Sequence, residues 1–191
     1  MANRKLSSGE AFEAYLVYQF RIREYIQMFQ ILRDIQEGRY CPEGTGPECP
    51  ATTVLTYVTG IFASLMDTAK KSLNVFDVWE ALYPQDFQAE IIGVRKAIEP
   101  SLIIIRSYRN NVAFHANVKL KEYVKAMQDF RNQRTKVVAA IEEFLALAEK
   151  LFRDQGRIPD CETRLDRALK KNFPRATPEA LQRLREYFTF S

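Results

Sequence analysis

The chain has 191 residues, of which 47% are hydrophobic and 27% are charged, and its formal net charge is +4. These values are typical of a globular domain and argue against a disordered chain. No run approaches the ~18 consecutive apolar residues of a membrane span, and no apolar segment of a secretory signal follows the first ten residues. We therefore expect a soluble, cytoplasmic protein with no membrane partner.

The first predicted element is a long amphipathic helix from about Gly9 to Glu37. Ser7 or Ser8 is suited to cap its start, and Gly38 ends it. Its apolar residues recur at spacings of three and four, as expected for one face of a helix. These residues are Tyr15, Tyr18, Ile22, Tyr25, Phe29 and Leu32.

A loop rich in proline and glycine, residues 38–52, follows this helix. Cys41 and Cys49 bracket its "CPEGTGPEC" stretch, but a zinc site needs four ligands at tight spacings such as Cys-x2-Cys, and neither is evident. With Cys161 these are the three cysteines of the chain, too few for a disulfide framework. We expect free thiols, no metal site and no cofactor.

A second helix is predicted from about Thr53 to Ser72 or Leu73, and the segment 74–82 continues it with a bend. A third helix begins near Gln85. Pro100 interrupts it at a cost of about 3 kcal/mol, so we expect a kink or two abutting helices. Two rows on this helix recur every seven residues: Ile91, Ile98, Ile105 and Val112, and Val94, Ser101, Tyr108 and His115.

A long fourth helix is predicted from about Leu120 to Phe152. Its apolar positions recur at helical spacing, so they are expected to be buried. These positions are Met127, Phe130, Val137, Ile141, Phe144, Ala148 and Leu151.

The tail of the chain has shorter helical signals. Thr177 is suited to cap a helix, Pro178 fits its first position, and Glu179 favours the positive helix end. Together the elements predict an all-α fold, a bundle of four to five main helices with a short C-terminal helical extension. We expect the bundle to span residues 1–156 and the extension, residues 157–191, to pack on the same domain.

The charges are unevenly distributed along the chain. Residues 41–94 contain two lysines and seven acids, a net charge of −5, whereas residues 95–136 contain ten basic residues and three acids, a net charge of +7. A local positive field favours partners that bear phosphates. Pairing of oppositely charged helices across the bundle is an equally open interpretation.

The basic segment contains "SYRNNVAFHAN", residues 107–117, with the only histidine of the chain, His115. Tyr108, Asn111 and His115 share a face of a continuous helix, but Arg109 lies about 240° around the axis from His115. Three arrangements would bring Arg109 and His115 together. The helix breaks within "RNNVAF", the long arginine side chain wraps around it, or two copies of the chain share the site. Alternatively, His115 is a packed histidine hydrogen-bonded by Asn111.

The stretch from Arg109 to His115 resembles the signature of the HEPN superfamily, an arginine and a histidine separated by four to six residues. Asn110, directly after the arginine, is typical of that signature. The resemblance covers this motif and the helical organisation of about residues 9–152, and it is strongest to the toxin-like and abortive-infection-type members. Some toxin members have a tyrosine two places after the histidine, which a partner nucleotidyltransferase modifies. Here Asn117 occupies that place, so we do not expect this regulation.

The resemblance implies a metal-independent endoribonuclease with Arg109 and His115 facing each other across a homodimer. Histidine exchanges protons near neutrality, and arginine holds phosphate with a planar donor fork. Asn110 and Asn111 would orient the imidazole or the phosphate, with Tyr108 as a further supporting residue, and the products would be a 2′,3′-cyclic phosphate and a 5′-hydroxyl. We expect nearby basic residues to hold RNA phosphates. They are Arg95, Lys96, Arg106, Lys119, Lys121 and Lys125.

Two other interpretations stay open. The chain is a non-catalytic HEPN-type module that binds a nucleotide or a protein, or it is a helical adaptor outside that superfamily. An antitoxin or regulatory protein is a further expected partner of a toxin. Signatures of other enzymes, such as a glycine-rich phosphate loop or His-Glu-x-x-His, are not found in the sequence.

Overall fold

The computed structural model describes residues 7–39, 48–67, 73–113 and 119–189. Within these ranges the regular elements are all helical, so the expected all-α class is confirmed. The described residues form eight α-helices, one π-helical turn and one short 3-10 helix, which is more than the four to five main helices expected. No helix among them is long and apolar enough to cross a membrane.

Helix α1 (Ser8–Gln36) forms as its end signals predict. The Ser7 hydroxyl accepts the Glu10 N–H at 3.3 Å, and the Glu10 carboxylate accepts the Ser7 N–H at 3.2 Å, which makes a capping box. Gly38 has a φ of +73° and ends the helix, because glycine adopts this left-handed conformation without strain. The predicted apolar face is buried apart from Tyr18, which is half-buried.

The predicted second helix is divided into two. Helix α2 (Glu48–Leu65) begins inside the segment expected to be a loop, and Pro50 lies in its first turn, where no N–H is needed. Helix α3 (Val75–Leu82) is separate from α2, because the Asn74 side chain accepts the Phe76 N–H at 2.9 Å and caps a new helix start. The expected continuation with a bend is therefore wrong. Cys41 lies outside the described residues.

Helix α4 (Gln85–Tyr108) runs through Pro100 as one helix, so the alternative of two abutting helices is wrong. Its two predicted rows are buried as far as Tyr108. The chain then continues as a π-helical turn, η1 (Arg109–Ala113). A π-helix is wider than an α-helix, because its characteristic hydrogen bonds join residues five apart instead of four.

The predicted fourth helix is divided at Gln133 into α5 (Leu120–Asn132) and α6 (Arg134–Arg153). Both helices pack on α4, while α5 also contacts η1 and α6 also contacts α1. Met127 is 39% exposed, whereas the other expected positions are buried.

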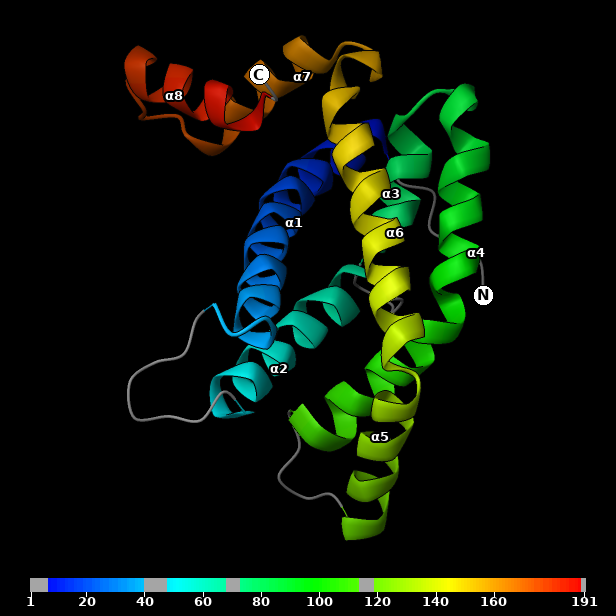
Figure 1. Ribbon diagram of the computed structural model, residues 1–191. Helices are drawn as coiled ribbons and strands as arrows, with labels where there is room; N and C mark the ends of the chain where they lie inside the picture. The colour runs from blue at the N-terminus through cyan, green and yellow to red at the C-terminus, as the bar shows by residue number, and fades with distance from the viewer. Residues whose placement is uncertain (1–6, 40–47, 68–72, 114–118, 190–191) are drawn as a thin grey trace.

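Aromatic side chains from four helices form the centre of the core. The Phe144 ring of α6 lies 5.5 Å from the Trp79 ring of α3 and 5.3 Å from the Phe62 ring of α2. Tyr25 of α1 lies 5.6 Å from Phe62. Figure 1 shows α4 and α6 side by side, with α1 and α2 on the other side of this core and α5 at one end.

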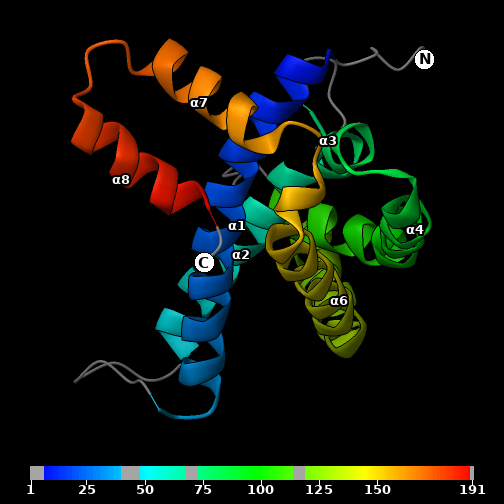
Figure 2. The same cartoon turned by 90° about the horizontal axis from the view of Figure 1, so that it is seen from above.

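The C-terminal elements lie at the opposite end from α5 (Figure 1). They are η2 (Gln155–Arg157), α7 (Cys161–Asn172) and α8 (Pro178–Phe188), and Thr177 caps α8 as predicted. Figure 2 shows α7 and α8 beside α1, on the side away from α4. Lys171 forms an ion pair with Glu13 of α1 at 2.6 Å. The division at residues 156 and 157 remains a prediction.

Candidate functional site

The predicted motif lies where α4 changes to η1. Arg109 is the first residue of the π-helical turn, and its N–H shares the carbonyls of Ile105 and Arg106. Asn110 and Asn111 follow, and asparagine side chains compete with helical backbone hydrogen bonds. Single π-helical turns are rare and frequently lie at functional sites. The helix geometry therefore changes at the arginine and the two asparagines of the predicted motif.

The Arg109 side chain is half-buried. Within the part of the chain that the structure describes, its guanidinium has no ion-pair or hydrogen-bond partner. A planar guanidinium with five N–H donors suits a carboxylate or phosphate oxygen pair. Arg109 is thus available to an anion.

His115 lies outside the described residues, so its position relative to Arg109 and to a second copy remains a prediction. The same holds for Asn117. Of the three predicted arrangements, the structure bears on the first one. The α-helix ends at Tyr108, directly before "RNNVAF", and the chain stays helical from Arg109 through Ala113, so a break within that stretch remains a prediction.

Arg106, expected to hold an RNA phosphate, has a contact inside the fold. Its Nη2 donates to the carbonyl of Met66 at 2.6 Å, in the turn after α2. Asn74 Nδ2 donates to the same oxygen at 3.2 Å. Arg106 therefore connects the end of α4 to the turn after α2.

Tyr108, expected to support the site, is 2% exposed. Its ring lies 4.5 Å from the ring of Phe130 on α5. Burial raises the pKa of Tyr108, and the nearby Thr56 side chain opposes that rise. The structure places this side chain in the core, where it packs α4 against α5.

The two asparagines have different surroundings. Asn110 is exposed, whereas Asn111 is half-buried and its Nδ2 donates to Ser107 Oγ at 3.4 Å. Asn111 and Lys125 line a hollow of about 520 Å³ between α4 and α5. No pattern in the sequence indicates this hollow, because residues of separate helices line it. Its charged lining is Lys125 with the carboxylates of Glu122 and Asp129, which does not suit a phosphate.

Arg95 and Lys96 lie far from the motif. They precede Arg109 by fourteen and thirteen residues, or about 20 Å along the helix axis. Arg95 forms ion pairs with Asp77 at 2.7 Å and Glu80 at 2.8 Å. Partial burial lowers the pKa of Arg95, but hydrogen bonds to both carboxylates outweigh it, so the pKa is raised. The structure does not bring these two residues to Arg109.

Lys119, Lys121 and Lys125 are exposed at the start of α5, which packs against η1. They are the expected phosphate-binding residues that the structure brings to the motif's end of the molecule. Among the described residues, no group of three or more histidine, cysteine, aspartate or glutamate side chains is placed to hold a metal ion. Cys161 is a free, half-buried thiol, and burial raises its pKa.

Comparisons of the chain with models of known families, with curated proteins and with solved structures find no match. The function is therefore argued from the residues and their geometry.

Proposed function

We propose that the chain is a metal-independent endoribonuclease of the HEPN type, a cytoplasmic toxin or defence effector that acts as a homodimer. The supporting observation is Arg109. Its guanidinium is half-buried at a change of helix geometry and has no hydrogen-bond or ion-pair partner among the described residues. By contrast, Arg95 and Arg106 on the same helix are engaged within the fold.

In this proposal Arg109 binds the scissile phosphate and stabilises the charge that develops on it. His115 takes the proton of the 2′-hydroxyl, whose oxygen attacks the phosphorus, and the bond to the 5′-oxygen breaks. A second imidazole protonates that leaving oxygen. Because each chain has one histidine, the second imidazole comes from the other copy. The products are a 2′,3′-cyclic phosphate and a 5′-hydroxyl.

The test is RNA cleavage in excess chelator by the wild-type chain, Arg109→Ala and His115→Ala. Losing a transition-state donor or a proton carrier lowers the rate by about 10²- to 10⁴-fold. Arg153→Ala is the matched control, since Arg153 is an exposed arginine at the last position of α6, the end of that helix away from α5. Cleavage that persists in both motif variants would contradict the proposal.

The second candidate is a non-catalytic HEPN-type module that binds a nucleotide or a protein, such as an antitoxin. The specific observation in its favour is that two residues just before the motif have structural contacts. Arg106 donates to the Met66 carbonyl, and the Tyr108 ring packs on Phe130. This candidate predicts that no RNA is cleaved under any condition, and that His115→Ala lowers thermal stability. The same chelator assay, with a melting curve of each variant, separates the two candidates.

A further inference from the structure

Helix α5 exposes a strip of large apolar side chains. Leu120 is 76% exposed, Tyr123 and Val124 are each 41% exposed, and Met127 is 39% exposed. At about 100° per residue, these four lie within an arc of about 100°. We call them the α5 strip. The helix is held in the fold through another side, where Phe130 is buried against Tyr108.

The charges of α5 are arranged around this strip. Lys121 lies about 110° from the centre of the strip, and Lys119 lies at the helix start. Lys125 lies on the side opposite the strip, about 150° from its centre, and shares that side with the acids of the helix, Glu122 and Asp129. Within the described residues, no ion pair involves these three lysines. The cations nearest the strip are thus Lys119 and Lys121, with Arg131 within its arc one turn beyond Met127.

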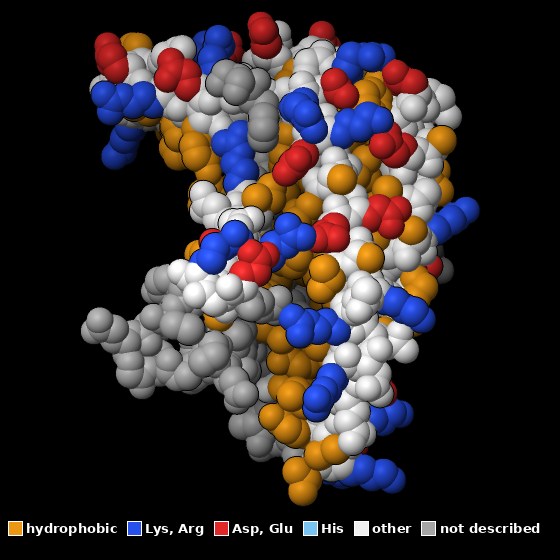
Figure 3. Space-filling view, viewed as in Figure 1, with side chains coloured by type: hydrophobic (Ala, Val, Ile, Leu, Met, Phe, Trp, Pro, Cys, Tyr) orange, Lys and Arg blue, Asp and Glu red, His pale blue; other side chains and the backbone are white. Residues whose placement is uncertain are grey.

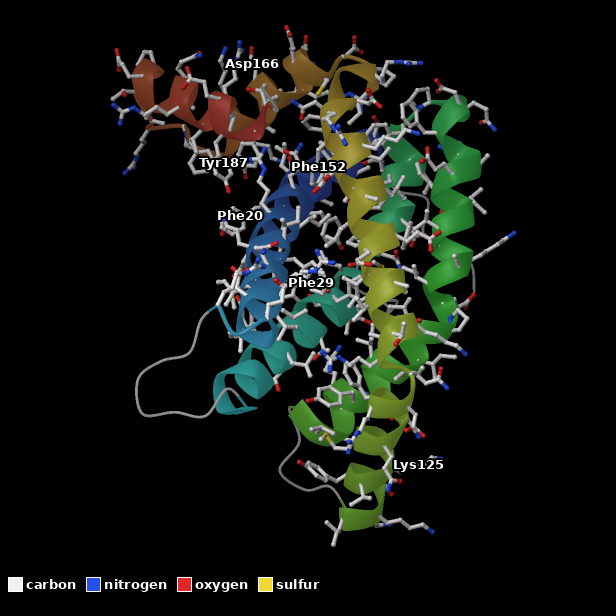
Figure 4. The ribbon with its side chains drawn as sticks, in the orientation of Figure 1. Phe20, Phe29, Lys125, Phe152, Asp166 and Tyr187 are labelled. Carbon is white, nitrogen blue, oxygen red and sulfur yellow. The ribbon has the colours of Figure 1, made fainter. Side chains whose placement is uncertain are left out.

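The strip lies at an end of the molecule. In Figure 3, hydrophobic side chains are exposed at the end formed by α5, with Lys and Arg side chains along its edge. Figure 4 shows Lys125 on this helix, at the end opposite Asp166 of α7. A projecting helix at the end of an elongated bundle reaches a flat surface without interference from the other helices.

We propose that the α5 strip binds the surface of an anionic lipid bilayer. The helix would lie in the plane of the interface, with the apolar side chains of Leu120, Val124 and Met127 below the headgroups and Tyr123 at their level. Lys119 and Lys121 would extend to the phosphates and carboxylates of the lipids. The sequence predicts no membrane partner because it has no segment that could span a bilayer. Binding at the bilayer surface does not require such a segment, so this proposal departs from that expectation. It does not depend on the proposed ribonuclease activity.

Two other occupants fit the α5 strip less well. RNA stacks on aromatic rings such as Tyr123, but it would leave the aliphatic Leu120 and Val124 against a polar backbone. A second copy related by a two-fold axis would place the same surface opposite itself, and therefore bring the lysines of both copies together. A bilayer covers the aliphatic side chains and neutralises the lysines at once.

The test is co-sedimentation of the full chain with vesicles of phosphatidylcholine alone and of phosphatidylcholine with about one third phosphatidylserine. We expect at least about tenfold tighter binding to the anionic vesicles. Leu120→Ala with Val124→Ala and Met127→Ala should weaken that binding at least about tenfold, since the apolar contact is lost. Lys119→Gln with Lys121→Gln should weaken it about fivefold for each lysine, and high salt should weaken it further.

The matched control is Val17→Ala with Ile31→Ala and Ile92→Ala, which removes three exposed apolar side chains on α1 and α4. The control should bind like the wild type, and circular dichroism should show that both triple variants keep their helix content, because alanine favours helix. Equal binding to neutral and anionic vesicles, or an equal loss in the control, would overturn the proposal. So would a strip variant that binds vesicles normally but loses RNA binding or self-association.

Discussion

The Arg106 guanidinium and the Met66 carbonyl meet at 2.6 Å, and this bond connects the helix that bears the motif to the end of α2. Arg106→Met keeps the apolar stem but removes the donor. We expect the free energy of unfolding to fall by about 1–3 kcal/mol, the usual effect of losing a charged hydrogen-bond donor. Urea denaturation followed by circular dichroism measures it. Lys96→Met, an exposed change on the same helix, should alter stability by less than about 0.5 kcal/mol. Unchanged stability with weaker RNA binding would instead make Arg106 a phosphate ligand.

Asn74 and Arg106 donate to the same carbonyl, so their effects on stability should be coupled. Asn74→Ala removes the bond to Met66 at 3.2 Å and the cap of α3, and we expect a loss of about 1–2 kcal/mol. In the double variant the Met66 oxygen loses both donors, so the combined loss should exceed the sum of the single losses by at least about 0.5 kcal/mol. A double-mutant cycle in urea measures this excess. Strictly additive losses would show that the two donors act independently.

Three buried tyrosines predict a loss of stability at alkaline pH. Burial raises the pKa of Tyr15, Tyr25 and Tyr83 above the value of about 10 for an unfolded chain. Above about pH 10 the unfolded chain releases these protons while the folded chain keeps them. Their contribution is therefore fully present below pH 10 and is lost as the pH rises, at about 1.4 kcal/mol per unit for each tyrosine. Urea midpoints at about pH 9 and about pH 11 would show it.

Tyr25→Phe separates this effect from the other groups that titrate at high pH. Within the described residues the Tyr25 hydroxyl is buried without a hydrogen-bond partner, so the variant should be at least as stable as the wild type at neutral pH. Its alkaline loss should be smaller by about 1.4 kcal/mol per pH unit. Tyr83→Phe is the contrast, because the Tyr83 hydroxyl lies 3.1 Å from that of Tyr15 and donates to the Leu151 carbonyl. Identical alkaline slopes in wild type and Tyr25→Phe would contradict this account.

The sequence predicted those parts of the fold whose signals are local. Ser7, Gly38 and Thr177 mark helix ends through their own side chain or backbone, and the structure has helix ends at all three. The buried rows of α1 and α4 follow from helical spacing alone. The spacing of apolar residues by three and four positions is therefore enough to identify the all-α fold class and most of the core residues.

The parts that could not be predicted depend on contacts between distant segments. Gln133 has no helix-breaking chemistry, yet α5 ends and α6 begins there, with both helices packed on α4. The π-helical turn from Arg109 to Ala113 is too short to change the periodicity of the sequence. Likewise, the residues next to Arg95 and Arg106 in the sequence do not show that each guanidinium already has a partner within the fold. Arg95 pairs with Asp77, and Arg106 donates to the Met66 carbonyl.

Helix α8 should open independently of the bundle. It has no fully buried residue. Its Tyr187 ring contacts α1 at two side chains, both on the outside of the core. The ring centres of Phe20 and Tyr187, labelled in Figure 4, lie 6.2 Å apart, and the Arg23 guanidinium lies 4.9 Å from the Tyr187 ring centre. Elements with few buried apolar contacts open with low free energies. We expect amide hydrogen exchange in α8 to be faster than in α6.

Phe20→Ala removes one ring of that contact and should make exchange in α8 about fivefold faster, as expected for a loss of about 1 kcal/mol. Exchange in α1–α6 should stay the same, because the Phe20 side chain is 53% exposed and lies outside the core. Ile92→Ala is the control, an exposed apolar change on α4 that should leave α8 unaffected. If α8 and α6 exchange together in every variant, the C-terminal helices are a cooperative part of the bundle, and the predicted division after residue 156 is wrong.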